Sequence, residues 1–311
     1  MPIITISRGI CSGGTQLAEL LHAKLGWPVL SQEDVSAAAA KTYRMSKEEL
    51  RRGLYLPANF YERFTDRKTR YLLATQATIA ELLDNGNGIY HGLAGQFLFH
   101  NLRNAFKVRI VAPTSLRVEN SVSRKGMTRH EAARHIREAD EHRHLWGRQI
   151  FDADGNDPDL YDLVVYLEKV SLATAATLIA EIMRGRDRQP TSESIQEFED
   201  FALEKRIKAE LFFNSPFTPD IAQVHVRKGA VHLTGGRPFE DVRAKIVEFV
   251  GQIRGVTAIH TDHDSVEAMD ITLDPHSVLS STDARASDVM LRLEQYPNCR
   301  GNCTIREAIV A

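Results

Sequence analysis

The sequence predicts an α/β protein in which helices flank a parallel sheet, followed by a smaller α+β module. Over the first 185 residues, β-branched stretches alternate with stretches whose apolar residues recur at helical spacing. A polar segment punctuated by Gly and Pro interrupts this alternation, and two short strands with alternating apolar residues follow it. With 311 residues, of which 43% are hydrophobic, the chain is long enough to form two domains.

The chain opens with a strand, a glycine-bearing loop and a helix. A β-branched run at 3–6 predicts a strand that ends at Ser7, and the loop at 8–15 follows it. Leucines then recur at helical spacing over 17–25, and Gly26 supplies a stop signal. The same alternation continues with a helix over about 69–84, strands at 88–90 and 108–112, helices across 114–146, a strand at 163–166 and a helix at 171–183.

The second module begins after the polar segment, which we expect to be a linker over 186–196 that follows a first domain at 1–185. A helix lined by aromatic and aliphatic residues comes first, and the segments 224–226 and 231–233 then form a hairpin around Gly229. A second helix and a last strand complete an α+β domain at 197–265. Signals for regular structure weaken in the tail at 266–311.

Composition and charge exclude several function classes. The 39 Lys and Arg residues nearly balance 41 Asp and Glu residues, so the chain is not a basic nucleic-acid binder. No apolar stretch approaches the roughly 18 residues that span a bilayer, and the start of the chain lacks the basic region of a signal peptide. We therefore expect a cytoplasmic protein without a transmembrane segment. Cys11, Cys299 and Cys303 are expected to be reduced thiols, and the role of the last two stays open.

The first loop carries the strongest chemical signal. A strand that feeds a glycine loop and then a helix places backbone N–H groups around an anion-sized space, which favours phosphate binding. In the motif G-x-x-x-x-G-K-[ST], Arg8 takes the place of the first Gly and Gly14 that of the Lys, while Gly13 and Thr15 match. Arg8 can supply the missing charge, and the Thr15 hydroxyl can bind Mg²⁺. On spacing alone, a tight turn that binds no ligand explains the loop equally well.

The first 185 residues resemble the cytidylate kinase-like family, whose loop reads roughly S-R-x-x-G-S-G-G. The segment 4–8 followed by Ser12-Gly13-Gly14 carries the first match. Further matches follow in the same order as in the family: 26–28 with Glu33, Val111-Ala112-Pro113 with Arg117, Asp140 with Arg143, and 159–164. Two positions depart from the family pattern. Cys11 replaces a loop glycine, and the segment 91–95 lacks the arginine of a G-R-G motif.

The resemblance implies a P-loop fold that binds ATP and Mg²⁺ and transfers a phosphoryl group to a nucleoside monophosphate of the cytidylate type. Loop residues would hold the phosphates, namely Gly9, Ser12, Gly13, Gly14 and Thr15, and Thr15 would also bind the metal. The arginines that would neutralise charge are Arg8, Arg117 and Arg143. We expect Arg134 and Arg137, in the same helical stretch as Arg143, to lie on a solvated face.

The C-terminal module resembles a BON domain, whose pattern V-x-V-x-x-G-x-V-x-L-x-G fits residues 224–235 and is completed by Arg254-Gly255-Val256. This resemblance implies a module that binds a protein or a membrane surface. Three functions stay open at this point: a phosphotransferase, a catalytically silent nucleotide sensor that signals through the BON-like domain, and a structural protein whose loop binds nothing. The sequence does not identify the phosphoryl acceptor or the oligomeric state.

Overall fold

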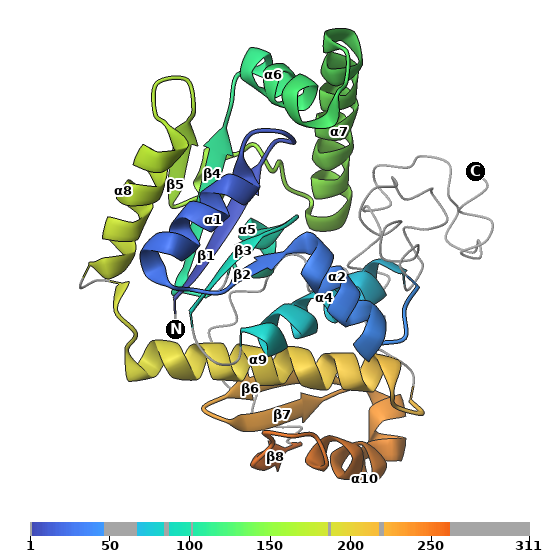
Figure 1. Cartoon of the computed structure of the whole chain (residues 1–311). Helices are drawn as coiled ribbons and strands as arrows, with labels where there is room; N and C mark the ends of the chain where they lie inside the picture. The colour runs from blue at the N-terminus through green and yellow to red at the C-terminus, as the bar shows by residue number, and fades with distance from the viewer. Residues whose placement is uncertain are drawn as a thin grey trace, which may run out of the picture. The chain divides into compact units, whose positions relative to one another are not determined.

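A computed structural model describes residues 2–46, 67–83, 87–100, 102–185, 188–217 and 221–261 (Figure 1). The expected tail at 266–311, with Cys299 and Cys303, lies outside these residues. Within the described part, no helix is long and apolar enough to cross a membrane.

The centre of the molecule is a parallel sheet of five strands in the order β2-β3-β1-β4-β5. The strands are β1 (Ile3–Arg8), β2 (Val29–Ser31), β3 (Gly88–His91), β4 (Ala105–Val111) and β5 (Leu163–Tyr166). The first strand, β1, lies between β3 and β4. The connections that follow β1 therefore lead to strands on one side of it, and later connections lead to strands on its other side. A reversal of this kind opens a crevice at the carboxyl ends of the strands, where open α/β sheets bind ligands.

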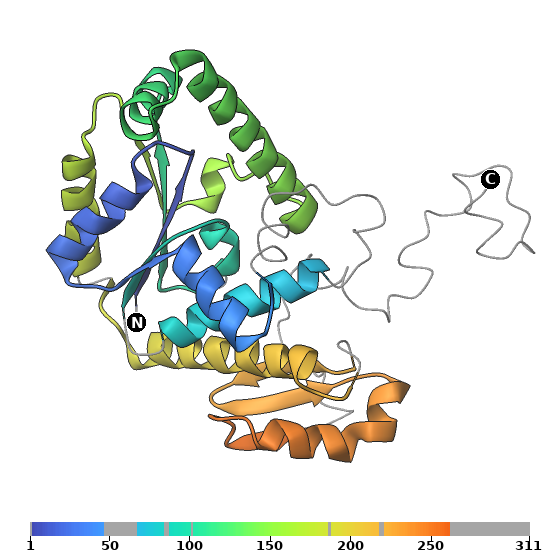
Figure 2. The ribbon, with the colours of Figure 1, turned by 45° about the vertical axis from the view of Figure 1, so that its right-hand side comes forward.

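Helices cover both faces of this sheet, as the alternation in the sequence predicts (Figures 1 and 2). Ile4 and Ile6 of β1 pack with α1 (Gly14–Leu25) and α8 (Leu172–Arg184). Ile3 faces the opposite side, where it shares a core with α2 (Gln32–Thr42) and α4 (Arg67–Leu82). Successive side chains of a strand point to opposite faces, so the sequence of a strand that is buried on both faces is a continuous run of apolar residues.

The helices expected across 114–146 are two, α6 (Thr114–Lys125) and α7 (Arg129–Phe151). The first ends at Gly126, which adopts a left-handed conformation with φ 65°. The second begins at Thr128, whose side chain accepts a hydrogen bond from the Glu131 N–H while the Glu131 carboxylate accepts one from the Thr128 N–H. This reciprocal capping box starts a new helix, and the left-handed glycine ends the previous one. Two short helices complete this domain, α5 (Gly95–Leu98) and the 3₁₀ turn η2 (Pro158–Leu160).

The linker expected to reach residue 196 ends earlier, because α9 (Ser192–Phe213) already begins at Ser192. Thr191 caps this helix through a hydrogen bond that its side chain accepts from the Ser194 N–H. Ser, Thr and Glu at 191–194 therefore start a helix, although their polarity is typical of a linker. The boundaries 1–185 and 197–265 stay predictions.

Helix α9 belongs to two hydrophobic cores. Phe198, Ala202 and Ala209 are buried in the core that also contains α2 and α4. Ile207 and Leu211 lie in another core, formed with α10 (Arg237–Gly251) and with a sheet of β6 (Gln223–Arg227), β7 (Ala230–Thr234) and β8 (Ala258–His260). Figures 1 and 2 show α9 between α4 and the β6–β7 hairpin. The two cores therefore share a helix. The amphipathic period of a helix alone does not show that it packs in two cores.

The predicted hairpin is confirmed. The strands β6 (Gln223–Arg227) and β7 (Ala230–Thr234) pair antiparallel, with Lys228 and Gly229 in left-handed conformations at the turn. The last strand, β8 (Ala258–His260), pairs parallel to β7. This element order is the one that the resemblance to a BON domain predicts, whereas the resemblance itself and a protein or membrane-surface partner stay predictions.

Truncation of Phe198 tests whether α9 is part of the first core. Phe198 is 2% exposed, so we expect Phe198→Ala to lower the free energy of unfolding by about 3–5 kcal/mol, measured by urea denaturation. Leu178→Ala is the control, because Leu178 is 47% exposed on α8 and should cost about 0.5 kcal/mol or less. Equal losses in the two variants would contradict the packing of α9.

Candidate active site

The loop after β1 ends in a helix N-terminus that is open to an anion. Gly13 caps α1 in a left-handed conformation (φ 90°, ψ 17°) without a side-chain hydrogen bond, and the first turn contains no acidic residue. The first N–H groups of a helix have no partner inside the helix, so they attract phosphate. Thr15 is exposed in this first turn. Ser12 is 2% exposed and donates its hydroxyl hydrogen bond to the Gly9 carbonyl at 2.7 Å, so its side chain shapes the loop.

The Arg8 side chain lies against the start of α1. A Cβ atom at Gly14 would approach Arg8 Cδ to 2.0 Å and Arg8 Nε to 2.4 Å. Gly14 occupies the position where the G-x-x-x-x-G-K-[ST] motif has its lysine. A side chain at position 14 is therefore incompatible with the observed place of Arg8, and the Arg8 guanidinium brings a positive charge to the helix start instead.

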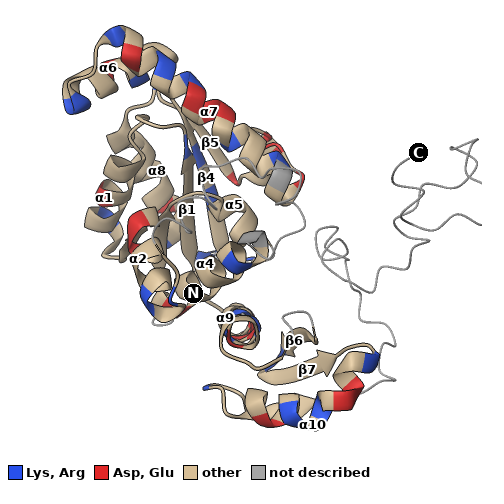
Figure 3. Ribbon diagram, turned by 90° about the vertical axis from the view of Figure 1, so that its right-hand side faces the viewer, with Lys and Arg blue, Asp and Glu red and all other residues tan. Residues whose placement is uncertain are grey.

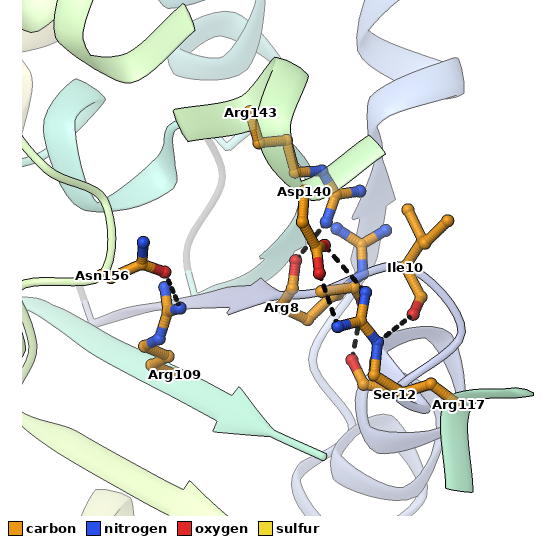
Figure 4. A network of polar contacts seen from close by, with 9 residues as sticks. Arg8, Ile10, Ser12, Arg109, Arg117, Asp140, Arg143 and Asn156 are labelled. Carbon is orange, nitrogen blue, oxygen red and sulfur yellow. Dashed lines mark hydrogen bonds and ion pairs between the residues drawn. The ribbon is translucent and has the colours of Figure 1, made fainter. Parts of the chain in front are cut away.

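Donors from α6 and α7 bind the carbonyl groups of the loop (Figure 4). Arg117 Nε donates to the Ile10 carbonyl at 2.9 Å, and Asn120 Nδ2 donates to the Cys11 carbonyl at 2.9 Å. Arg143 donates from α7 to the Arg8 carbonyl. These three bonds fix the loop relative to two helices that lie more than 100 residues further along the chain.

Arg117 is the most connected of these donors. Its side chain is 9% exposed and forms a bidentate ion pair with Asp140, at 2.7 and 2.8 Å. Its guanidinium also lies directly on the loop, because a Cβ at Gly9 would come within 2.8 Å of Arg117 Cζ. The carboxylate of Asp140 offsets the charge of Arg117, so this arginine holds the loop in place more than it adds positive potential.

A cavity of about 370 Å³ opens at the carboxyl ends of β1, β3 and β4. Four of the residues predicted from the sequence line it, namely Arg8, Gly9, Arg117 and Arg143. The other predicted residues, Ser12, Gly13, Gly14 and Thr15, are not part of this lining and belong to the loop end and the first turn of α1. The structure thus separates the predicted site into a helix N-terminus and an arginine-lined cavity.

Several residues of the cavity were not predicted from the sequence. The most notable is Arg109 of β4, which donates to the Gly155 carbonyl, to Asn156 Oδ1 at 2.6 Å and to Tyr161 Oη at 3.2 Å. The segment that lacks the family arginine contributes Gly92, Leu93 and Ala94 to the lining. One feature of the sequence could have pointed to Arg109, namely that it alternates with the apolar Val108 and Ile110, which are buried. Arg109 therefore lies on the opposite sheet face from them, the same face as Ser7, its partner in β1.

Charges elsewhere on α7 behave as the sequence predicts. Both signs occur along this helix (Figure 3), and Arg134 and Arg137 are exposed. Arg134 pairs with Glu138 at 3.9 Å, with both side chains about 60% exposed. These two arginines therefore lie on a solvated face, whereas Arg143 reaches the loop.

His91, at the end of β3, is buried beside the cavity. Burial disfavours the charged imidazolium and the positive charge of Arg8 adds to this effect, so the pKa of His91 lies below its ordinary value of 6.5, although Glu33 and Asp34 oppose the shift. His91 Nδ1 is buried without a hydrogen-bond partner among the described residues. His91 is therefore neutral at pH 7.

Removal of the Asp140 charge is expected to destabilise the protein. Asp140→Asn leaves a buried guanidinium without its counter-charge, and we expect a loss of about 1–2 kcal/mol in urea denaturation. This is less than for a fully buried pair, because the Asp140 side chain is 43% exposed. Glu138→Gln on the same helix is the control, with an expected change of less than about 0.5 kcal/mol. Equal effects would show that the Arg117 contact is not important for stability.

The lowered pKa of His91 predicts a specific pH dependence of stability. Between pH 6.5 and the lower native pKa, the unfolded chain binds a proton that the folded chain does not, so stability falls as the pH falls through this window. His91→Asn should make the melting temperature less dependent on pH between about 7 and 5. Melting curves that keep the wild-type slope in this variant would contradict the assignment.

Comparison with solved structures found proteins of low similarity to this chain. An uncharacterized protein from Eubacterium ventriosum ATCC 27560 is 18% identical, with 60% of this chain and 99% of that chain covered and a TM-score of 0.47. Shikimate kinase from Bacteroides thetaiotaomicron is 14% identical, with 59% and 99% covered and a TM-score of 0.37. A gluconokinase from Sinorhizobium meliloti 1021 is 15% identical, with 59% and 95% covered and a TM-score of 0.34.

At these identities and TM-scores, the similarities do not identify an activity. No curated protein matches the chain. The cytidylate kinase-like family, by contrast, matches residues 3–169, which is more than half of the chain and includes β1, the loop, Arg117, Asp140 and Arg143. The chain therefore belongs to the cytidylate kinase-like family.

Proposed function

We propose that this protein is an ATP-dependent phosphotransferase whose acceptor is a small molecule of the nucleoside monophosphate type. Family membership supports a nucleotide-binding phosphotransferase. The single observation that carries the proposal is the position of Arg8, which lies against the N-terminus of α1 and also lines the cavity next to it. This arrangement suits phosphoryl transfer, since catalysis rests on positioning and on neutralising charge between donor and acceptor.

The donor side of the site is the start of α1. The N–H groups of the first turn, from Gly14 onward, would hold the phosphates of ATP, and the exposed Thr15 hydroxyl would contribute to binding Mg²⁺. ATP with Mg²⁺ supplies the phosphoryl group when bound. Arg8 replaces the charge of the lysine that position 14 lacks, because its side chain lies where a lysine would begin.

The acceptor side is the cavity. Arg8 and Arg143 would neutralise charge at the end of the cavity nearest the loop, where Arg143 binds the Arg8 carbonyl. Arg117 would act as a positioning residue, because its donors are bound to Asp140 and to the Ile10 carbonyl. The buried Trp146 and the partly buried Leu93 would exclude water from this space.

A nucleotide assay with matched arginine variants tests the proposal. The protein is incubated with Mg-ATP and separately with CMP, UMP, dCMP, AMP and GMP, and products are separated by chromatography. We expect ADP and one diphosphate in equal amounts. Arg143→Ala should lower kcat/KM by roughly 10²–10³-fold, because it removes a cation at the reacting phosphates. Arg134→Ala, an exposed arginine on the same helix, should leave the rate unchanged.

Two results would contradict the proposal. One is full activity in Arg143→Ala, provided its melting temperature equals that of the wild type. The other is an absence of turnover with every acceptor while ATP still raises the melting temperature, because a ligand that binds the folded state stabilises it. This second result would identify a nucleotide sensor.

A further inference from the structure

Arg109 has hydrogen-bonding capacity that its protein contacts do not use. A guanidinium has five N–H donors. Within the part of the chain that the structure describes, three are used: two from one terminal nitrogen, to the Gly155 carbonyl and Tyr161 Oη, and one from the other, to Asn156 Oδ1. The Nε–H and one terminal N–H have no partner there, although the side chain lines the cavity.

Among the residues that the structure describes, Arg109 also has no carboxylate as a counter-charge. Its three partners are a carbonyl, an amide oxygen and a phenol, and its guanidinium lies 5.4 Å from the centre of the Tyr161 ring. Arg117 in the same cavity has Asp140 as its counter-ion. A partly buried cation without a counter-ion attracts an oxygen that carries negative charge or strong partial charge.

Gln96 lies beside Arg109 with an unused acceptor. Gln96 is 6% exposed and lines the cavity, and its Oε1 is buried without a hydrogen-bond partner among the described residues. Gly155 lies between the two side chains, because Arg109 binds its carbonyl and a Cβ at Gly155 would lie 3.6 Å from Gln96 Nε2. An unpaired buried amide oxygen costs free energy, and a ligand with an N–H or O–H group can remove that cost.

Arg109 lies in a different part of the cavity from the arginines at the loop. Figure 4 shows Arg109 and Asn156 apart from the group formed by Arg8, Arg117 and Arg143. An acceptor that places its reacting oxygen at Arg8 and Arg143 therefore brings its other end to Arg109 and Gln96. That end has to combine a hydrogen-bond-accepting oxygen, for Arg109, with an N–H or O–H donor, for Gln96.

We propose that Arg109 and Gln96 determine acceptor specificity by binding the end of the acceptor that does not react. This inference rests on the proposed phosphotransferase function for the identity of the reacting end. The chemistry at Arg109 and Gln96 is an oxygen acceptor next to a donor group. The carbonyl and amine of a nucleobase provide it, and so do the carboxylate and hydroxyl of a sugar acid.

Direct binding measurements test this independently of turnover. Isothermal titration calorimetry is run with CMP, UMP, dCMP, AMP, GMP, shikimate and gluconate, on wild type, Arg109→Met, Gln96→Leu and Lys107→Met. Lys107 is the matched control, because it lies two residues before Arg109 on the same strand and is not part of the cavity lining. We expect the best-bound compound to lose about 10- to 100-fold in affinity in Arg109→Met, and none in Lys107→Met. The identity of the compound that binds best shows whether the site binds a nucleobase or a sugar acid.

Further readouts separate a binding role from a structural one. Arg109→Lys should recover part of the lost acceptor affinity, and the affinity for Mg-ATP should stay at the wild-type level in all variants. An equal loss of ATP affinity in Arg109→Met would overturn the proposal, because it indicates a general distortion. Unchanged acceptor affinity, or no binding of any compound to the wild type, would also overturn it. Binding that depends on Arg109 but occurs without turnover would support this inference while contradicting the proposed phosphotransferase.

Discussion

The site depends on one buried guanidinium, that of Arg117. It joins the loop, through the Ile10 carbonyl, to two consecutive helices more than 100 residues further along the chain: its own helix α6, and α7 through Asp140. A buried cation is tolerated only with a well-placed counter-charge and with most of its donors bound, and Asp140 meets this condition with two hydrogen bonds. The contact also explains why position 9 is a glycine, because any side chain there would collide with the guanidinium.

This arrangement determines where positive charge is available. Arg117 is paired with Asp140, whereas the Arg8 side chain crosses the start of α1, a course that requires position 14 to have no side chain. The glycine at the position of the motif's lysine and the observed place of the Arg8 side chain therefore depend on each other. On this account, the loss of the lysine is compatible with phosphate binding, and Arg109 adds positive charge in a different part of the same cavity.

The sequence was sufficient for local features and insufficient for those that depend on tertiary contacts. β-Branched runs and glycines identified β1 and its loop, and the family resemblance singled out Arg8, Arg117 and Arg143, which the fold brings to one cavity. The role of Arg109 could not be predicted, because alternation assigns it to a sheet face without showing what covers that face. The shared packing of α9 was missed for a similar reason, since helical periodicity identifies an apolar face but not its partners.

The most direct test of this account is the affinity for Mg-ATP, measured by isothermal titration calorimetry, in wild type and in Arg117→Met. Methionine keeps much of the side-chain volume but removes the bonds to the loop and to Asp140. If the guanidinium holds the loop in its phosphate-binding shape, the variant should remain folded, judged by its circular dichroism spectrum, and should bind Mg-ATP at least about tenfold more weakly. Wild-type affinity in a folded Arg117→Met would contradict the account.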